Sequence, residues 1–344
     1  FMQAVAAGES YGLVNPRSKK VVKTLDAREV FRKIAGMAWS NGEPGLIFID
    51  KMNADNPTPA IGMIESTNPC GEQPLLPYES CNLGSINLGA FVSVNEDGKA
   101  AVDYRALAKT VHQSVHFLDN VIDASKFPMP EIESVTKSNR KIGLGVMGFA
   151  DLLVRLGIPY DSDQAVQIAS EIMRFIRSEG VKESQRLAEI RGPFPNFTGS
   201  IFDQPGQKSV RNATITTVAP TGTISSIAGC SSGIEPYFAL AYERHVLAGE
   251  TLIEIVPLLA QCLAQGGLNQ EEILKQVALT GSLKDNTDVP GALADLFKTS
   301  LEIPPERHLA VQAAFQQHTD NAVSKTINLP NETTIDQVED ILMK

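Results

Sequence analysis

Cysteines, basic residues and long apolar runs are all scarce in this sequence. Its four cysteines contain no Cys-x-x-Cys pair, which fits a reducing cytosol better than secretion. No apolar run approaches the length of a membrane-spanning helix, and the N-terminus is not a signal peptide. Lys and Arg number 30 against 40 Asp and Glu, and the net charge of −10 argues against a nucleic-acid surface or an anionic-membrane partner. Phosphorylated small molecules stay open, because loop amides and helix N-termini bind phosphate without side-chain cations.

Length and composition are those of an ordinary globular protein. The 344 residues suffice for about two average domains or one large α/β unit, and no internal repeat or low-complexity tract interrupts them. The chain starts at Phe1 without an initiator Met and closes on a helical pattern at 335–344. We therefore expect both ends to be cut, as in a fragment, a processed product or one half of a split protein.

Apolar periodicity predicts most of the secondary structure. Helical spacing predicts helices over residues 26–39, 103–124, 129–139, 149–156, 163–191, 251–266, 269–277 and 302–317. A turn at 15–20 is expected between two short strands. The continuous apolar run at 46–50 predicts a buried strand, and β-branched alternation predicts strands at 213–218 and 323–330.

A cysteine lies in the most constrained stretch of the chain, residues 66–74. Pro69, Gly71 and Pro74 are turn formers, so the thiol of Cys70 is expected on a tight loop and not in a helix or a central strand. The alternative is a buried, inert cysteine in a proline-rich turn, since free cysteine is among the most buried residue types.

Two polar side chains flank this thiol at a spacing of two. Asn68 precedes Cys70 and Glu72 follows it. In a tight loop, side chains two residues apart can converge on one ligand. A thiol, a base and a hydrogen-bonding amide are parts of a site of covalent or radical chemistry.

A second candidate site follows the strand predicted at 213–218. A strand, a hydroxyl-rich Pro/Gly turn and a following helix leave free N–H groups at a helix start, an arrangement that holds phosphate. The alternative is a capped helix without a ligand. The residues of this candidate phosphate site are Pro220, Thr221, Gly222, Thr223, Ile224 and Ser225.

Other patterns are weaker. Glycines 143, 145 and 148 spell G-x-G-x-x-G, but no strand places the acidic residue that a dinucleotide site needs, so we expect close strand–helix packing. His112 and His116 lie four apart on a helix without a third ligand, which favours a solvated or core-edge position over a metal site. Cys230 and Cys262 are expected to pack and not to react.

Several motifs together resemble one enzyme family. Asn-Pro-Cys-Gly-Glu at 68–72, followed by Ser-Cys-Asn-Leu-Gly-Ser-Ile-Asn-Leu at 80–88, resembles the active-site finger loop of ribonucleotide reductases. Pro-Thr-Gly-Thr-Ile-Ser at 220–225 and Gly-Ile-Glu-Pro at 233–236 resemble their phosphate-binding loop. Together with residues 321–328, the sequence around Cys70 is most similar to the adenosylcobalamin-dependent class, class II.

The resemblance implies an α/β fold, part of a ten-stranded α/β barrel made of two half-barrels with a central finger loop. Residues 1–344 would form the later part of this one barrel domain, with no separate second domain. The implied activity is thiyl-radical reduction of ribonucleotides to 2′-deoxyribonucleotides for DNA synthesis.

The resemblance also implies roles for single residues. Cys70 would carry the thiyl radical, Glu72 would be the base, and Asn68 would hydrogen-bond the ribose hydroxyls. Cys81 would be one member of the dithiol that becomes a disulfide in each turnover, and residues 220–225 would bind the substrate phosphates.

The implied partners are adenosylcobalamin, a ribonucleotide substrate, a thioredoxin-like dithiol reductant and an N-terminal half of the reductase that carries the second redox cysteine. A homodimer and a cytoplasmic location are further expectations, with no nucleic acid and no membrane. Two alternatives stay open. One is a class I large-subunit segment that uses a separate radical-generating subunit, and the other is a non-catalytic, reductase-derived nucleotide-binding module.

Overall fold

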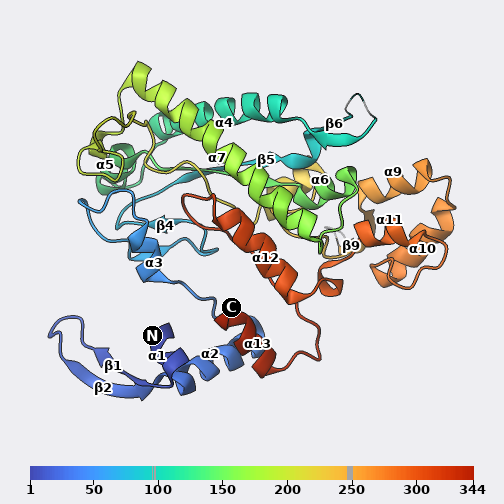
Figure 1. The fold of residues 1–344 in the computed structure, drawn as a ribbon, viewed down its shortest axis with the longest axis horizontal. Helices are drawn as coiled ribbons and strands as arrows, with labels where there is room; N and C mark the ends of the chain where they lie inside the picture. The colour runs from blue at the N-terminus through green and yellow to red at the C-terminus, as the bar shows by residue number, and fades with distance from the viewer. Residues whose placement is uncertain (95, 97, 246–250) are drawn as a thin grey trace. The chain divides into compact units, whose positions relative to one another are not determined.

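The computed structural model describes residues 1–94, 96, 98–245 and 251–344 (Figure 1). The chain divides into two compact units. Residues 1–47 and 329–344 form the first unit, and residues 48–328 form the second.

The first unit is a β-hairpin with three helices. Its elements are α1 (Met2–Ala7), β1 (Ser10–Val14), β2 (Val21–Asp26), α2 (Ala27–Asn41) and α13 (Ile335–Met343). β1 and β2 pair antiparallel around the turn predicted at 15–20. Asp26 caps α2, since its side chain accepts a hydrogen bond of 2.9 Å from the backbone N–H of Glu29. The buried side chains of Val5, Ala27 and Phe31 form the core of this unit.

A small parallel sheet lies at the centre of the second unit. β5 (Asn82–Asn87) pairs in parallel with β8 (Ile142–Met147). Next to β8 in the sheet lies the extended segment 214–218, which pairs with β8 through the isolated bridge between Leu144 and Thr216. Residues 321–324 come next and pair with this segment through the isolated bridge between Val218 and Val323. Among the described residues this sheet does not close into a barrel.

Helices cover this sheet. α4 (Tyr104–Ala124), α7 (Asp163–Arg191) and α12 (Pro305–Gln316) pack beside one another (Figure 1). Ser162 caps α7, since its Oγ accepts a hydrogen bond of 3.1 Å from the N–H of Ala165. One face of α4 is buried and apolar, because five of its side chains are at most 3% exposed: Leu107, Val111, Val115, Leu118 and Ile122.

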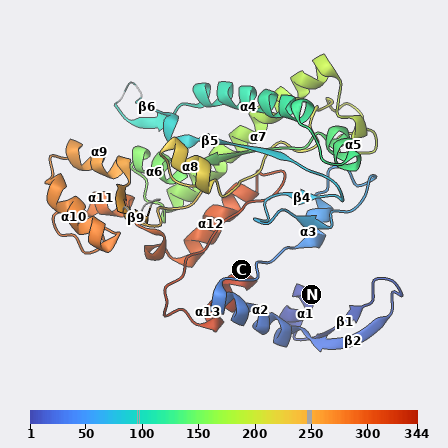
Figure 2. The same ribbon diagram turned by 180° about the vertical axis from the view of Figure 1, so that it is seen from behind.

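The remaining elements of the second unit connect and flank this core. They include α3 (Ile49–Ala54), β3 (Ser66–Thr67), β4 (Pro74–Leu75), η1 (Leu88–Ala90), β6 (Val92–Val94), β7 (Ala100–Val102), α5 (Pro130–Asn139), α6 (Phe149–Leu156), η2 (Pro195–Phe197) and α8 (Gly222–Ala228). They end with β9 (Ala241–His245), β10 (Thr251–Ile255), α9 (Pro257–Gln265), α10 (Gln270–Thr280), α11 (Gly291–Leu296) and η3 (Ser300–Glu302). α9, α10 and α11 gather around a second apolar core that includes Leu259, Val277 and Phe297 (Figure 2).

Four secondary-structure predictions are wrong in part or in whole. Residues 46–50 form no buried strand: Ile47 and Phe48 are 50% and 48% exposed, and α3 starts at Ile49. The helix predicted at 251–266 begins only at Pro257, because residues 251–255 pair with β9 as β10. The predicted strands at 213–218 and 323–330 are reduced to an extended segment with two isolated bridges, and beyond Val323 no residue up to 330 is in a strand.

The glycines of the G-x-G-x-x-G pattern allow close packing, as predicted, but mainly between strands. A Cβ on Gly145 would lie 2.2 Å from the carbonyl oxygen of Thr217 in the neighbouring segment. A Cβ on Gly143 would lie 2.6 Å from the side-chain nitrogen of Gln73. Gly148 has a φ of 72° and stands at the start of α6. The pattern therefore serves to bring β8 against segment 214–218 and against the loop that contains Gln73.

Candidate active site

The stretch around Cys70 is a short hairpin. β3 and β4 pair antiparallel with Thr67 opposite Pro74. Asn68 closes the loop, since its N–H donates to the carbonyl of Gln73 over 3.2 Å and its Oδ1 accepts from the N–H of Gln73 over 3.0 Å. The constrained loop predicted from the prolines is therefore present.

Cys70 lies at the tip of this hairpin. The N–H of Gly71 donates to the carbonyl of Asn68 over 3.0 Å, which makes residues 68–71 a β-turn with Pro69 at its second position and Cys70 at its third. Gly71 has a φ of 81°, a conformation that favours glycine. Cys70 is exposed, so it is not the buried cysteine of the alternative reading.

Glu72 anchors the hairpin to the sheet. Its carbonyl oxygen accepts one hydrogen bond of 2.9 Å from Oγ1 of Thr217 and another of 3.0 Å from the N–H of Ala322. Thr217 and Ala322 belong to the two segments that follow β8 in the sheet. The position of the thiol loop is thus fixed by residues about 145 and 250 positions later in the chain.

The Glu72 side chain is buried without full hydrogen bonding. The residue is 2% exposed, and its Oε2 has no hydrogen-bond partner in the part of the chain that the structure describes. Leaving a buried carboxylate oxygen unpaired costs free energy, so such groups call for a functional explanation. This oxygen therefore keeps an unused capacity to accept a hydrogen bond.

The Asn68 side chain already has a structural role. Its Oδ1 accepts from Gln73, so the amide nitrogen is the part of the side chain available to a ligand. Gln73 itself is 2% exposed, and both atoms of its side-chain amide lack partners among the described residues. Sequence reasoning missed Gln73 and Thr217, because neither lies in the part of a motif that suggested chemistry.

Cys81 is partly exposed and directly precedes β5. Its Sγ donates to the carbonyl of Asn82 over 3.5 Å. Burial raises the pKa of Cys81, the nearby Lys141 lowers it, and Glu79 and Glu72 raise it further. The Glu72 carboxylate is thus one of the charged groups that act on the Cys81 sulfur.

The predicted phosphate loop has a strained start. Thr221 has a φ of 58°, rare for a residue other than glycine, and directly precedes α8. Its Oγ1 accepts a hydrogen bond of 2.7 Å from the N–H of Gly233, which joins the motifs at 220–225 and 233–236. Ser225 is buried, with its Oγ 2.9 Å from the Oγ of Ser232, whereas Thr223 is exposed.

This loop directly follows the segment that holds the thiol hairpin. Pro220 follows three residues after Thr217, the residue that holds the carbonyl of Glu72. Behind Ser225 lies a cavity of about 650 Å³ whose lining includes Cys230, Glu235 and Tyr237. Burial and the nearby Asp151 raise the pKa of Cys230 to about 11, which fits the prediction that this cysteine does not react.

A buried cluster of charges joins two further motifs. Nζ of Lys325 donates to Glu235, to the carbonyl of Thr326 over 2.6 Å and to Nδ1 of His308 over 2.9 Å. The N–H of Thr326 donates to Oε1 of Glu235 over 2.8 Å. Glu235 belongs to the Gly-Ile-Glu-Pro motif and Lys325 to the stretch 321–328, so two motifs that the sequence suggested separately form one cluster.

The two histidines of α4 each contact a charged side chain of α7. Nε2 of His112 lies 2.8 Å from Oε2 of Glu179, and Nε2 of His116 lies 2.9 Å from an Arg191 nitrogen. No group of three or more metal-ligating side chains occurs among the described residues. No helix of the described chain is long and apolar enough to cross a membrane.

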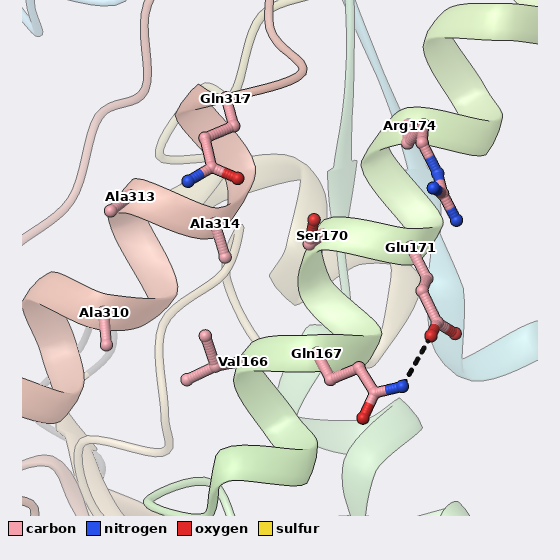
Figure 3. A pocket seen from close by; sticks show the side chains of 9 residues that line it. All are labelled: Val166, Gln167, Ser170, Glu171, Arg174, Ala310, Ala313, Ala314 and Gln317. Carbon is pink, nitrogen blue, oxygen red and sulfur yellow. Dashed lines mark hydrogen bonds between the residues drawn. The ribbon is translucent and has the colours of Figure 1, made fainter.

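A second cavity lies between α7 and α12 and does not involve the predicted site. It has a volume of about 540 Å³ and is lined by small and polar side chains, among them Ser170 and Ala314 (Figure 3). On its rim Gln167 donates to Glu171 over 2.8 Å (Figure 3). None of the predicted site residues lines it.

A family model described as "Ribonucleotide reductase, barrel domain" matches residues 1–344. The chain belongs to this family. The predicted α/β reductase fold is therefore confirmed at the level of the family.

Similar proteins include the "Vitamin B12-dependent ribonucleoside-diphosphate reductase" of Thermoplasma acidophilum. The two sequences are 52% identical over 95% of this chain and 42% of the length of the relative. The protein of the same name from Mycobacterium tuberculosis H37Rv is 47% identical over 99% of this chain and 47% of its own length. The chain thus spans less than half the length of these relatives. Among solved structures, the class Id ribonucleotide reductase alpha subunit of Actinobacillus ureae matches with a TM-score of 0.75 and 26% identity, over 92% of this chain and 59% of that one.

We predict that Thr217→Val loosens the thiol hairpin. Valine keeps the shape of the buried side chain but removes the hydroxyl that donates to the Glu72 carbonyl, which destabilises the hairpin by about 1 kcal/mol. Hydrogen exchange of residues 66–75 measures this effect. Thr110→Val, which removes a hydroxyl bonded within α4, is the control and should leave these amides unchanged.

We predict that His308 makes the chain less stable in acid. Burial, followed by the charge of Lys325, lowers the pKa of His308 to about 4. A histidine in the unfolded chain has a pKa of about 6.5, so below pH 6.5 the unfolded state binds more protons than the folded state. The free energy of unfolding therefore falls as the pH approaches 4, by at most about 3 kcal/mol. Urea unfolding at pH 7 and pH 5 should show a smaller difference for His308→Gln than for the wild type. Equal differences would contradict the prediction.

Proposed function

We propose that this chain is the catalytic barrel segment of an adenosylcobalamin-dependent ribonucleoside-diphosphate reductase. The observation that carries the proposal is the hairpin that presents Cys70 at its exposed tip while Thr217 and Ala322 hold the carbonyl of Glu72. The family of the chain and the names of relatives at 47–52% identity support this proposal. As a further part of the proposal, residues 1–344 work as one barrel segment.

In this proposal Cys70 and the residues around it each have a separate role in the reaction. The Cys70 sulfur takes a hydrogen atom from the 3′-carbon of the ribose, and a turn fixed by Pro69 supplies the required placement. The Glu72 carboxylate, whose Oε2 lacks a partner among the described residues, accepts the proton of the 3′-hydroxyl. The amide nitrogen of Asn68 hydrogen-bonds the ribose hydroxyls.

The overall reaction replaces the 2′-hydroxyl by hydrogen and releases water, while two thiols become one disulfide. Two S–H bonds are broken, one S–S bond is formed, and two electrons and two protons go to the product and water. Cys81 is one of the two thiols, and the other comes from a part of the enzyme outside this chain. A thioredoxin-like dithiol then reduces the disulfide in the cytoplasm.

Adenosylcobalamin fits the exposed position of Cys70, since a bulky radical generator needs access to the sulfur. When bound, this cofactor supplies the one-electron chemistry that converts the thiol to a thiyl radical. The chain's own contribution is to hold the sulfur at the hairpin tip. A class I segment would instead use a second subunit, and a cobalamin-binding titration separates these two possibilities.

The phosphates of the substrate bind at residues 220–225 in this proposal. The N–H groups at the start of a helix have no intrahelical partners and favour anions. Gly222, Thr223 and Ile224 are exposed and so accessible to a ligand. The same site would serve a non-catalytic nucleotide-binding module, which the experiment below distinguishes.

The main experiment measures ribonucleoside-diphosphate reduction with adenosylcobalamin and a dithiol. Because the relatives are about twice as long, we expect turnover only when a polypeptide covering their N-terminal part is added. Cys70→Ala should abolish turnover in this mixture, whereas Cys262→Ala, at a partly buried cysteine of α9, should retain it. Turnover by the Cys70→Ala mixture would rule out the proposed role of this thiol.

We predict that Thr223→Glu weakens substrate binding. A carboxylate beside the proposed phosphate site repels the diphosphate, and a loss of about 1.4 kcal/mol raises KM about tenfold. Steady-state kinetics of the complemented enzyme measure the change. Thr198→Glu places the same charge on an exposed threonine outside the motifs and should leave KM unchanged. Equal KM values for the two variants would contradict a phosphate site at 220–225.

A further inference from the structure

A buried ion pair lies beside Cys81 and has no role in the reaction described above. Nζ of Lys141 is 2.7 Å from Oε2 of Glu79, and the two side chains are 1% and 0% exposed. A buried ion pair is weak support for stability, because removing two charges from water offsets most of their attraction. This pair therefore calls for a reason other than stability.

The Glu79 carboxylate is fixed by several donors. Its Oε1 accepts from Nδ2 of Asn139 over 2.6 Å, and its Oε2 accepts from the N–H of Leu76 over 2.9 Å as well as from Lys141. The side-chain oxygen of Asn139 in turn accepts from Nδ2 of Asn196 over 2.7 Å. These hydrogen bonds fix the Glu79 carboxylate in one position, and the ion pair fixes the ammonium group of Lys141 beside it.

The sheet places this pair next to the Cys81 thiol. Asn82 and Ile142 are the first partners in the parallel pairing of β5 with β8, so Cys81 and Lys141 directly precede the same end of two neighbouring strands. Glu79 lies two residues before Cys81, and Ser80 between them is tied to α5 by a 2.8 Å contact with Thr136. Burial is the largest cause that raises the pKa of Cys81, Lys141 lowers this pKa, and Glu79 and Glu72 raise it, so the two charges of the ion pair act on the sulfur in opposite directions.

We propose that the Glu79–Lys141 ion pair positions Cys81 at the start of β5 and, because Glu79 balances the charge of Lys141, lets the buried sulfur remain a neutral thiol. This inference rests on the proposed function, in which Cys81 is a redox thiol. A neutral thiol carries the proton and the electron that it gives up when the disulfide forms. A thiolate would lack the proton and would react readily with oxidants and alkylating agents.

The test is alkylation of Cys81 by iodoacetamide in the 344-residue chain, measured between pH 6 and pH 10 by peptide mass spectrometry. Glu79→Gln leaves the Lys141 charge unbalanced, so a shift of about one pKa unit should raise the Cys81 rate at neutral pH about tenfold. Lys141→Met should lower the rate, and the double variant should return close to the wild type. Lys141→Arg keeps the charge and should resemble the wild type.

Two controls separate this local effect from unfolding. Glu271→Gln and Lys275→Met break an exposed ion pair of 2.8 Å on α10 and should leave Cys81 unchanged. Cys262 is the internal reference, because unfolding would raise its alkylation together with that of Cys81. The wild type alone provides one more measurement. The alkylation rate of its Cys81 should rise at a higher pH in the folded chain than in urea.

Two results would overturn the proposal. One is a Cys81 rate in folded Glu79→Gln that equals or falls below that of the wild type. The other is wild-type Cys81 that reacts at neutral pH as fast in the folded chain as in urea. Loss of the proposed function is a separate outcome: if Cys81→Ser retained turnover in the complemented enzyme, Cys81 would have no redox role, whatever its alkylation profile.

Discussion

The carbonyl oxygen of Glu72 is the point on which the site depends. It accepts hydrogen bonds from Thr217 and from Ala322, which belong to two different segments of the sheet. A two-residue pairing of β3 with β4 would be too small to hold a loop by itself. These two bonds make the hairpin an extension of the sheet, and the orientation of Cys70 follows from them.

The glycines of β8 make this anchoring possible. Any side chain at Gly145 would collide with the backbone at Thr217, and any side chain at Gly143 would collide with Gln73 of the hairpin. The absence of Cβ atoms lets the segment 214–218 and the hairpin approach β8 closely. The same segment continues into residues 220–225, so one stretch of chain connects the hairpin anchor with the proposed phosphate site.

Local signals were enough to predict the helices with clear caps and the thiol loop. Ser162 and Gly192 mark both ends of α7, and Pro69 and Gly71 define the turn that carries Cys70. Long-range pairing was not predictable: nothing in the sequence indicates that Lys141 meets Glu79 or that Thr217 meets Glu72. The apolar run at 46–50 was misassigned because such a run predicts a strand only where a neighbouring strand is present to pair with it.

The central claim is that the anchored hairpin presents Cys70 to a sugar whose phosphates bind at residues 220–225. The most direct measurement is a structure of the complemented enzyme with a bound ribonucleoside diphosphate. The account predicts phosphate oxygens on the N–H groups of residues 222–224 and the 3′-carbon of the ribose within about 4 Å of the Cys70 sulfur. A nucleotide bound elsewhere, with its ribose away from this sulfur, would contradict it.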